Sequence, residues 1–417
     1  MSPRYKADIC VIGGGAAGMM AAAEAARAGS DVLLIEKNDI TGKKLLITGK
    51  GRCNVTNNCS VKELVANTPV NGKFMYPALS RFTAQDTMQY FERLGVALKT
   101  ERGRRVFPVS DKAADIAEAL RKQLRSFGVR QLKAKAQAVL AEGGEVIGIS
   151  AGEATAACRA VILATGGCSY PATGSDGAGY EMARALGHKI IPPKASLVPL
   201  VSPDGDCARM QGLSLRNVKL TVLSGAGKKV YSEQGELLFT HFGLSGPLVL
   251  SASAHMRDFK NEKYTVSIDL KPALDEKTLD ARLLRDFAKY SNRDFSNSLS
   301  DIIPRLMIPV IVSRSRIAPD TKVNSVTREE RRRLLELLKD FRVEVSGTRP
   351  IAEAIVTSGG VDTREIDPRT MGSKLIKGLY FAGEIIDADA YTGGFNLQIA
   401  WSSAQAAAAA AAAGREE

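Results

Sequence analysis

Hydrophobic and polar positions follow two different patterns along the chain, one continuous and one alternating. Continuous apolar, β-branched runs are typical of strands buried inside a parallel sheet. Such runs occur at residues 7–12, 31–35, 160–163 and 378–382. Residues 216–270 instead alternate apolar and polar side chains, as in Val218-Lys219-Leu220-Thr221-Val222, which predicts strands with one solvent-facing side.

The remaining segments are mostly helical or short-stranded by pattern. Residues 275–340 predict helices, and residues 137–163 predict short strands with a turn at Gly143-Gly144. An alanine-rich helix is expected from Leu397 to a stop at Gly414. Because α/β character occupies both ends of the chain, we expect one nucleotide domain interrupted by an insertion, with a substrate cleft beside the cofactor.

A glycine motif follows the first predicted strand directly. Gly13, Gly15 and Gly18 form G-x-G-x-x-G, a small-residue helix runs from residue 16 to 28, and Glu36 ends the second strand. This context predicts a dinucleotide site. The glycines permit a tight turn and close approach of a pyrophosphate to the helix N-terminus, and Glu36 accepts the ribose hydroxyls of an adenosine.

Two later segments also run from a strand into glycines. They are Ala164-Thr165-Gly166-Gly167 and the stretch 378–384, and we expect both to return to the cofactor near Gly13. A simple NAD dehydrogenase needs only the first unit. The extra returns therefore favour a longer ligand, FAD.

Composition excludes several classes of protein. The 417 residues are 45% hydrophobic, and no apolar run reaches the ~18 residues of a membrane span. The start leads directly into the first strand without a signal-peptide pattern, so we expect a cytoplasmic protein without membrane partners. The six scattered cysteines and three histidines lack the spacing of zinc ligands, so we expect no metal centre.

The net charge of +12 raises the question of nucleic acid. The basic residues are dispersed, however, and the densest cluster, Arg328–Arg333, contains two glutamates and a capping box from Thr327 to Glu330. We therefore expect no specific nucleic-acid partner. The charge would attract an anionic cofactor or a small-molecule substrate.

At this point the sequence resembles a known family. The stretches GKKLLITGKGRCNVTN, FTHFGLSGPLVLSAS, TSGGVDTREIDPRTMGSKLIKGLYFAGE and DADAYTGGFNLQIAWSSA look like bacterial NAD(P)/FAD-dependent oxidoreductases, whose relatives include aminoacetone oxidase and a dehydro-bile acid reductase. The resemblance implies a glutathione-reductase-type FAD-binding Rossmann domain interrupted by a β-barrel-like and a helical domain. The expected parts are residues 1–192 and 351–417 for the FAD domain, 193–272 with 340–350 for the β domain, and 273–339 for the helical subdomain.

The resemblance also implies which residues hold the cofactor. Thr48 to Asn54 would line it, Ala138 or Val139 would touch the adenine side through the backbone, Glu384 would face the ribitol, and residues 396–398 would meet the flavin ring. The full expected set is Gly13, Gly15, Ala16, Ala17, Gly18, Glu36, Lys37, Lys44, Thr48, Gly49, Gly51, Arg52, Cys53, Asn54, Val139, Ala164, Thr165, Gly166, Gly383, Glu384, Gly394, Asn396, Leu397 and Gln398. Lys50 departs from the family's run of three glycines before Arg-Cys-Asn, which leaves the local geometry open.

Three functional hypotheses follow. The first is an FAD oxidoreductase that transfers hydride between flavin N5 and a small organic substrate, with NAD(P)H or oxygen as electron partner. The second, a flavin disulfide reductase, is disfavoured because Cys53 and Cys59 have five residues between them instead of the typical four, and no second NAD(P)H motif follows a strand. The third is a flavin-bearing RNA-binding or partner-binding protein without turnover, suggested by charge alone.

His241 is the candidate catalytic residue. It lies in FTHFGLSGP, where Phe239, Phe242 and Leu244 are too close together for a simple surface hairpin, so we expect a loop folded over the flavin. An imidazole there would move a proton during hydride transfer. The alternative is a histidine that holds the loop by a backbone hydrogen bond. For Cys10, Cys53, Cys168 and Trp401, packing is favoured over chemistry.

Overall fold

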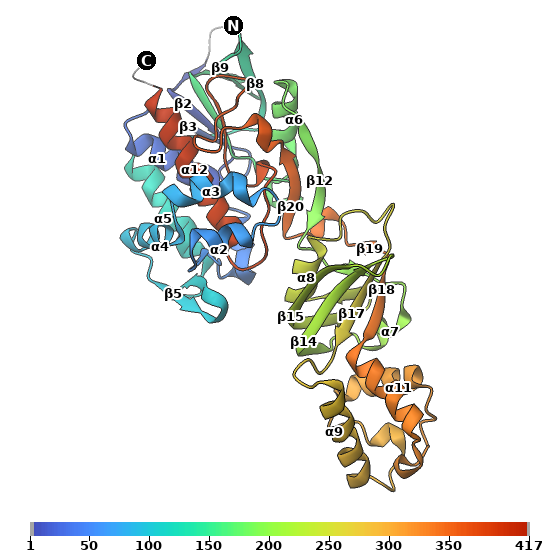
Figure 1. Ribbon diagram of the computed structural model, residues 1–417. Helices are drawn as coiled ribbons and strands as arrows, with labels where there is room; N and C mark the ends of the chain where they lie inside the picture. Colours follow the sequence, from blue (N-terminus) through green and yellow to red (C-terminus); the bar gives the residue numbers. More distant parts are fainter. Residues whose placement is uncertain (1–3, 415–417) are drawn as a thin grey trace. The chain divides into compact units, whose positions relative to one another are not determined.

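The computed structural model describes residues 4–414, and the chain divides into two compact units (Figure 1). Unit 1 joins the residues up to Ser196 to those from Ile351 onward, and unit 2 is Leu197–Pro350. The sequence placed the first boundary after residue 192 and the second after residue 350. Each unit has its own hydrophobic core.

Unit 1 is built on a five-stranded, all-parallel sheet of order β21-β11-β2-β3-β7. Its strands are β2 (Ile9–Ile12), β3 (Val32–Glu36), β7 (Arg130–Lys133), β11 (Ala160–Leu163) and β21 (Leu379–Phe381). Val11 lies in register with Leu34 on one side and Ile162 on the other. All four predicted apolar runs are therefore neighbours in one sheet, as expected for strands that are buried on both faces.

Three helices flank this sheet. They are α1 (Ala16–Arg27), α5 (Ala113–Ser126) and α12 (Phe395–Ala413). Figure 1 shows α12 beside α1, and their small side chains allow the two backbones to approach closely. The helix predicted from Leu397 begins two residues earlier. Trp401 on α12 is fully buried and donates a hydrogen bond to the Val55 carbonyl at 2.9 Å, so its packing role is confirmed.

Three smaller sheets complete unit 1. Their orders are β1-β10-β9-β8, β4-β6-β5 and β12-β20. Their strands are β1 (Tyr5–Lys6), β4 (Thr56–Asn57), β5 (Leu98–Glu101), β6 (Arg105–Pro108), β8 (Ala136–Glu142), β9 (Glu145–Ala151), β10 (Ala154–Ala157), β12 (Ile190–Ser196) and β20 (Val356–Val361). The remaining helices are α2 (Val61–Ala66), α3 (Gly72–Arg81), α4 (Ala84–Arg93) and α6 (Ala178–Ala185). The predicted turn at Gly143-Gly144 joins β8 to β9, and both glycines have positive φ.

Unit 2 contains a seven-stranded sheet of order β18-β17-β14-β15-β16-β13-β19. Its strands are β13 (Leu200–Val201), β14 (Ser214–Ser224), β15 (Lys229–Thr240), β16 (Gly243–Ser245), β17 (Tyr264–Asp269), β18 (Phe341–Val345) and β19 (Gly347–Thr348). Its helices are α7 (Gly205–Arg209), α8 (Pro247–Ser253), α9 (Glu276–Lys289), α10 (Ile308–Ser315) and α11 (Arg328–Lys339). Within residues 4–414 no ladder joins β18 to β19, so a closed barrel stays a prediction.

The basic segment at residue 328 is the start of α11. Thr327 and Glu330 cap each other's backbone N–H groups, which confirms the capping box. Arg331 pairs with Asp280 at 2.7 Å and Arg332 with Glu336 at 2.9 Å. Much of this cluster's charge is thus neutralised within unit 2. Across residues 4–414, no helix has the length and apolarity that a membrane span requires.

Candidate cofactor-binding site

The carboxyl ends of the parallel strands bring the glycine segments of unit 1 together. Gly13 N donates to Ile35 O, Ala164 N to Ile12 O, and Ala382 N to Leu163 O, each at 2.9 Å. Both strand-to-glycine returns therefore reach the edge of the sheet where the first glycine motif lies. In open α/β sheets this edge is where ligands bind.

Each glycine of the motif is explained by its surroundings. Gly13 has φ +102°, and a Cβ there would lie 2.5 Å from the Ala164 carbonyl oxygen. A Cβ on Gly18 would lie 1.7 Å from Gly13 O, so only glycine lets α1 pack on the turn. Gly15 caps α1 without a side-chain hydrogen bond and has no atom within 4 Å of its Cβ position, among the described residues. The helix N-terminus therefore faces open space, as phosphate binding requires.

Glu36 is held in place by backbone and side-chain donors. Its Oε2 accepts from Gly14 N at 2.7 Å, and its Oε1 accepts from Asn38 N at 2.8 Å and from Asn38 Nδ2 at 2.7 Å. A carboxylate has about four acceptor positions. The partly buried Glu36 can thus accept further hydrogen bonds from ribose hydroxyls without losing its anchors.

Glu384 is the centre of a polar network. Its Oε2 lies 2.6 Å from Lys44 Nζ, and its Oε1 accepts from Ser169 Oγ and from Thr357 N, both at 2.9 Å. Lys44 also donates to Ser169 Oγ at 2.7 Å. Burial raises the pKa of Glu384, but Lys44 and the hydrogen-bond donors outweigh burial and hold the pKa below its ordinary value. Glu384 is therefore an anionic anchor at neutral pH.

The segment between Thr48 and Asn54 has an unusual backbone. Gly49, Lys50, Gly51 and Cys53 have φ of 56°, 59°, 82° and 59°, in the left-handed region that glycine adopts most easily. Lys50 thus takes the conformation of its glycine neighbours, with its side chain exposed. Lys50 departs from the family pattern in residue type, but its backbone keeps the left-handed conformation that a glycine would adopt there.

Arg52 and Cys53 are engaged by the protein itself. Arg52 Nε donates to Asp111 Oδ1 at 2.8 Å, Arg52 also pairs with Glu101, and its guanidinium lies over Phe107. Burial raises the pKa of the Cys53 thiol to about 12, although Thr48 lowers it. Cys53 therefore stays protonated and packed, and Cys53 and Cys59 are both free thiols. This arrangement gives no support to a disulfide reductase.

The N-terminus of α12 offers backbone donors. Gly394, with φ +97°, caps the helix without a side-chain bond within the described residues. The Asn396 side chain is occupied by Ala390 N at 2.9 Å and Ala390 O at 2.7 Å. Gln398 is fully buried, its Oε1 accepts from Thr56 and Thr87, and its Nε2 donates to Phe82 O and Ser402 Oγ.

That residues 396–398 meet the flavin ring stays a prediction, but two of their side chains already have hydrogen-bond partners within the protein. The side-chain polar atoms of Asn396 and Gln398 form hydrogen bonds that anchor α12 and the loop before it. What they can offer a cofactor is the main chain of the first helical turn. The backbone N–H groups there carry the positive end of the helix dipole.

Two buried polar atoms at the site, Asn54 Oδ1 and Thr165 Oγ1, have no hydrogen-bond partner among residues 4–414. Buried polar atoms are normally hydrogen-bonded. Together with the open N-terminus of α1 and the Glu36 carboxylate, they fit a bound dinucleotide such as FAD. The site would hold it through the α1 backbone, Glu36, Asn54, Thr165 and the first turn of α12.

The other expected residues are distributed around this edge of the sheet. Lys37 pairs with Asp176 at 2.7 Å, Val139 is buried in β8, Gly166 has φ +74°, and a Cβ on Gly383 would lie 2.9 Å from Ala17 Cβ. The sequence analysis missed Ser169 and Thr357, which bind Glu384. Both adjoin segments it singled out: Ser169 follows the 164–167 glycines, and Thr357 opens the TSGGVD motif. No cluster of three metal-ligating side chains is found in residues 4–414.

The interpretation of the His241 segment is wrong in one respect. Residues 239–247 contain a hairpin between β15 and β16, with Phe239 paired to Leu244. Both side chains are fully buried in the core of unit 2, which explains why apolar residues are close together there. His241 is exposed at the turn, and its ring lies edge-on to Phe242. Thr240 Oγ1 holds the turn by donating to Gly243 O at 3.0 Å, and within the described residues the imidazole makes no hydrogen bond.

A parallel sheet with an open helix N-terminus, the Glu36 carboxylate beside it and two strand-to-glycine returns is the arrangement of a Rossmann-type flavoprotein oxidoreductase. The particular family is equally clear, because residues 7–410 match the model of the HI0933-like protein Rossmann domain. The chain belongs to this HI0933-like family.

Two curated relatives are similar over nearly their whole length. The chain is 34% identical over 403 residues to the ribosomal RNA dihydrouridine synthase of Escherichia coli K12, covering 96% of this chain and 97% of that protein. It is 31% identical over 410 residues to the 3-dehydro-bile acid delta(4,6)-reductase of Clostridium scindens, covering 95% and 96%.

Solved structures share the fold at low sequence identity. A flavocytochrome c3 fumarate reductase has a TM-score of 0.55 at 16% identity, covering 99% of this chain and 79% of that chain. A 3-ketosteroid-delta4-(5alpha)-dehydrogenase from Rhodococcus jostii RHA1 also has 0.55 at 16% identity, covering 99% and 98%. These likenesses bear on the fold alone.

Proposed function

We propose that this protein is an FAD-dependent reductase that converts uridine in ribosomal RNA to dihydrouridine. The observation that carries the proposal is the 34% identity, over 96% of the chain, to a ribosomal RNA dihydrouridine synthase. A second relative of the same name, from Haemophilus influenzae, is 30% identical over 97% of the chain. The net charge of +12 suits a polyanionic substrate. The proposal replaces the expectation of no specific nucleic acid.

The chemistry is the reduction of a carbon–carbon double bond conjugated to a carbonyl group. In uridine, a hydride adds to C6, and a proton adds to C5, so one two-electron donor and one proton account for the product. A nicotinamide dinucleotide is the proposed source of the electrons. When bound, FAD supplies hydride transfer at N5.

The residues of unit 1 would position the cofactor for this reaction. Glu36 would bind the adenosine ribose, and the N-terminus of α1 the pyrophosphate. The Lys44–Glu384 pair would fix the middle of the cofactor, where the ribitol is expected. The first turn of α12 would stabilise negative charge on the flavin ring through its backbone N–H groups. His241 is proposed as the donor of the proton to C5.

A second candidate substrate is a steroid dienone, because one relative is named a 3-dehydro-bile acid delta(4,6)-reductase. Both substrates carry an alkene conjugated to a carbonyl group, so the same hydride and proton transfers would serve. Electrostatic attraction to a chain with a net charge of +12 contributes little to the binding of a neutral or singly charged steroid. For this reason ribosomal RNA is the first choice.

A direct assay separates the two substrates. The purified, flavin-loaded protein is incubated with NADH or NADPH and either unmodified ribosomal RNA transcribed in vitro or a 3-oxo-delta(4,6) steroid. Nucleosides from the digested RNA and the extracted steroid are analysed by mass spectrometry. Dihydrouridine in the RNA supports the proposal. Reduced steroid with unmodified RNA would instead assign the second function.

A further inference from the structure

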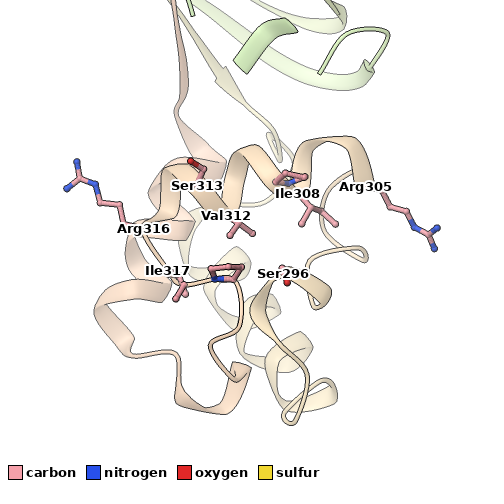
Figure 2. Close-up of a pocket in the computed structure, with 10 residues that line it drawn as sticks. Ser296, Arg305, Ile308, Val312, Ser313, Arg316 and Ile317 are labelled. Atoms are coloured by element: carbon pink, nitrogen blue, oxygen red, sulfur yellow. The ribbon is translucent and has the colours of Figure 1, made fainter. Parts of the chain in front are cut away.

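The helical part of unit 2 contains a groove that the cofactor site does not use. Its volume is about 750 Å³, and ten residues between Ser296 and Pro319 line it. Figure 2 shows Ile308, Val312 and Ile317 along its apolar floor. The lining includes two arginines and no acidic residue.

The two arginines stand at opposite sides of this groove. Arg305 begins the 3-10 turn that leads into α10, and Arg316 follows the last residue of α10. Figure 2 shows both guanidinium groups extended outward, away from the apolar floor and from each other. At 1.5 Å per helical residue, the backbone positions of Arg305 and Arg316 are separated by roughly 16 Å along the helix axis.

Neither guanidinium is neutralised by another residue that the structure describes. Within residues 4–414 the side chains of Arg305 and Arg316 have no hydrogen bond or ion pair, and both residues are exposed. The neighbouring Arg314, by contrast, pairs with Asp204 and Asp206. The positive charge of this face is therefore concentrated at the two ends of the groove.

Arg316 also occupies a backbone position that favours glycine. Its φ is +58°, in the left-handed region at the C-terminal end of α10. Glycine is the residue most often found at such a helix end. An arginine there gives up this conformational advantage and places a free cation beside the groove.

We propose that this groove is a docking site for a single-stranded segment of ribosomal RNA. Arg305 and Arg316 would bind backbone phosphates, and unstacked bases would lie on the apolar floor between them. Sequence-directed RNA recognition targets single-stranded segments, whose bases are free to leave the stack. The inference rests on the proposed function, because it names the surface that holds the same substrate.

The test uses the full flavin-loaded protein and a double variant, Arg305→Ala with Arg316→Gly. The glycine suits the left-handed backbone, so the variant should fold at least as well as the wild type. Arg285→Ala is the matched control, since Arg285 is also exposed, has no pairing among the described residues and does not line the groove. Binding of unmodified ribosomal RNA is measured by filter retention between 0.05 and 0.2 M salt.

We expect the double variant to bind this RNA on the order of tenfold more weakly, with a salt slope smaller by about 1.4, since each single-strand phosphate contact contributes about 0.7. A single-stranded uridine oligonucleotide should compete for the wild-type protein, and an RNA duplex should not. The control should behave as wild type. Flavin content and flavin bleaching by NADPH should be unchanged in both variants.

Equal affinity of the double variant and the wild type would overturn the groove proposal. So would unaltered binding to naked RNA combined with lost modification of ribosomal particles, which would assign the groove to a protein partner. Failure of the proposed function is seen separately, as the absence of dihydrouridine from RNA treated with the wild-type protein.

Discussion

Lys44 and Glu384 lie 340 positions apart in the sequence, yet Lys44 Nζ is 2.6 Å from Glu384 Oε2. This ion pair joins the segment after the second strand of the sheet to the loop after the last strand. Both side chains are mostly buried, with 22% and 18% of their surfaces exposed. The pair thus links the two stretches of chain that form the cofactor site.

Lys44→Met is expected to destabilise the protein by roughly 1–3 kcal/mol at pH 7, because it leaves the Glu384 carboxylate mostly buried without its cation. Lys44 holds the pKa of Glu384 below its ordinary 4.5, so the stabilisation is present above that pH and is lost as the pH falls through the lowered pKa. The difference in Tm between wild type and variant should therefore be largest near pH 7 and shrink below pH 4.5. Lys43→Met, at an exposed neighbour, is the control. A difference in Tm that is constant from pH 7 to pH 4 contradicts the assignment.

Glu36→Ala should weaken FAD retention by roughly 10- to 100-fold, since hydrogen bonds to a charged group are worth about 1.5–3 kcal/mol. The measurement is flavin occupancy after dialysis, with the circular dichroism spectrum as a check on folding. Glu92→Ala, at an exposed glutamate on α4, should retain flavin as the wild type does. Full flavin occupancy in Glu36→Ala would show that the carboxylate does not bind the ribose.

Leu397→Pro removes one backbone N–H from the first turn of α12 and should lower the flavin reduction potential. A helix-terminus interaction is worth about 0.3–1 kcal/mol, which corresponds to a shift of roughly 6–20 mV for a two-electron couple. Leu397→Ala keeps the N–H and should leave the potential unchanged. Equal potentials in the two folded, flavin-bound variants would argue against a flavin ring at this helix end.

His241→Ala and His241→Gln should each lower turnover by roughly 10²-fold with flavin content unchanged, if the imidazole delivers the proton. Because His241 is exposed and Thr240 holds the turn, neither variant should lose thermal stability. Steady-state turnover and Tm are measured together. Near-wild-type turnover in both variants, or rescue of activity by Gln alone, would remove His241 from the mechanism.

Much of the nucleotide domain could be predicted from local pattern. The four apolar runs became neighbours in one parallel sheet, because a strand buried on both faces must be apolar throughout. The β5–β6 pair was missed, since Lys99, Glu101 and Arg105 make its strands polar. Such strands are recognisable only once their partners are known.

Hydrogen bonds between side chains far apart in the chain could not be predicted from local sequence patterns. Nothing local in residue 357 or residue 169 indicates that both would bind Glu384. Phe239 and Leu244 were assigned to a cover over the flavin, whereas both pack in the core of unit 2. The apolar character of a side chain predicts burial, but it does not indicate which core the side chain packs in. Gln398 was assigned to the cofactor, but four partners inside the protein use its amide.

The split of unit 1 into two chain segments has a consequence for biosynthesis. Every strand of unit 2 lies between residues 200 and 348, so this unit is fully synthesised before β21 and α12 leave the ribosome. Until then the nascent sheet lacks its edge strand, Lys44 lacks Glu384, and α1 lacks the helix that packs on it. The Glu384 loop and the N-terminus of α12 are therefore the last parts of the candidate cofactor site to be synthesised.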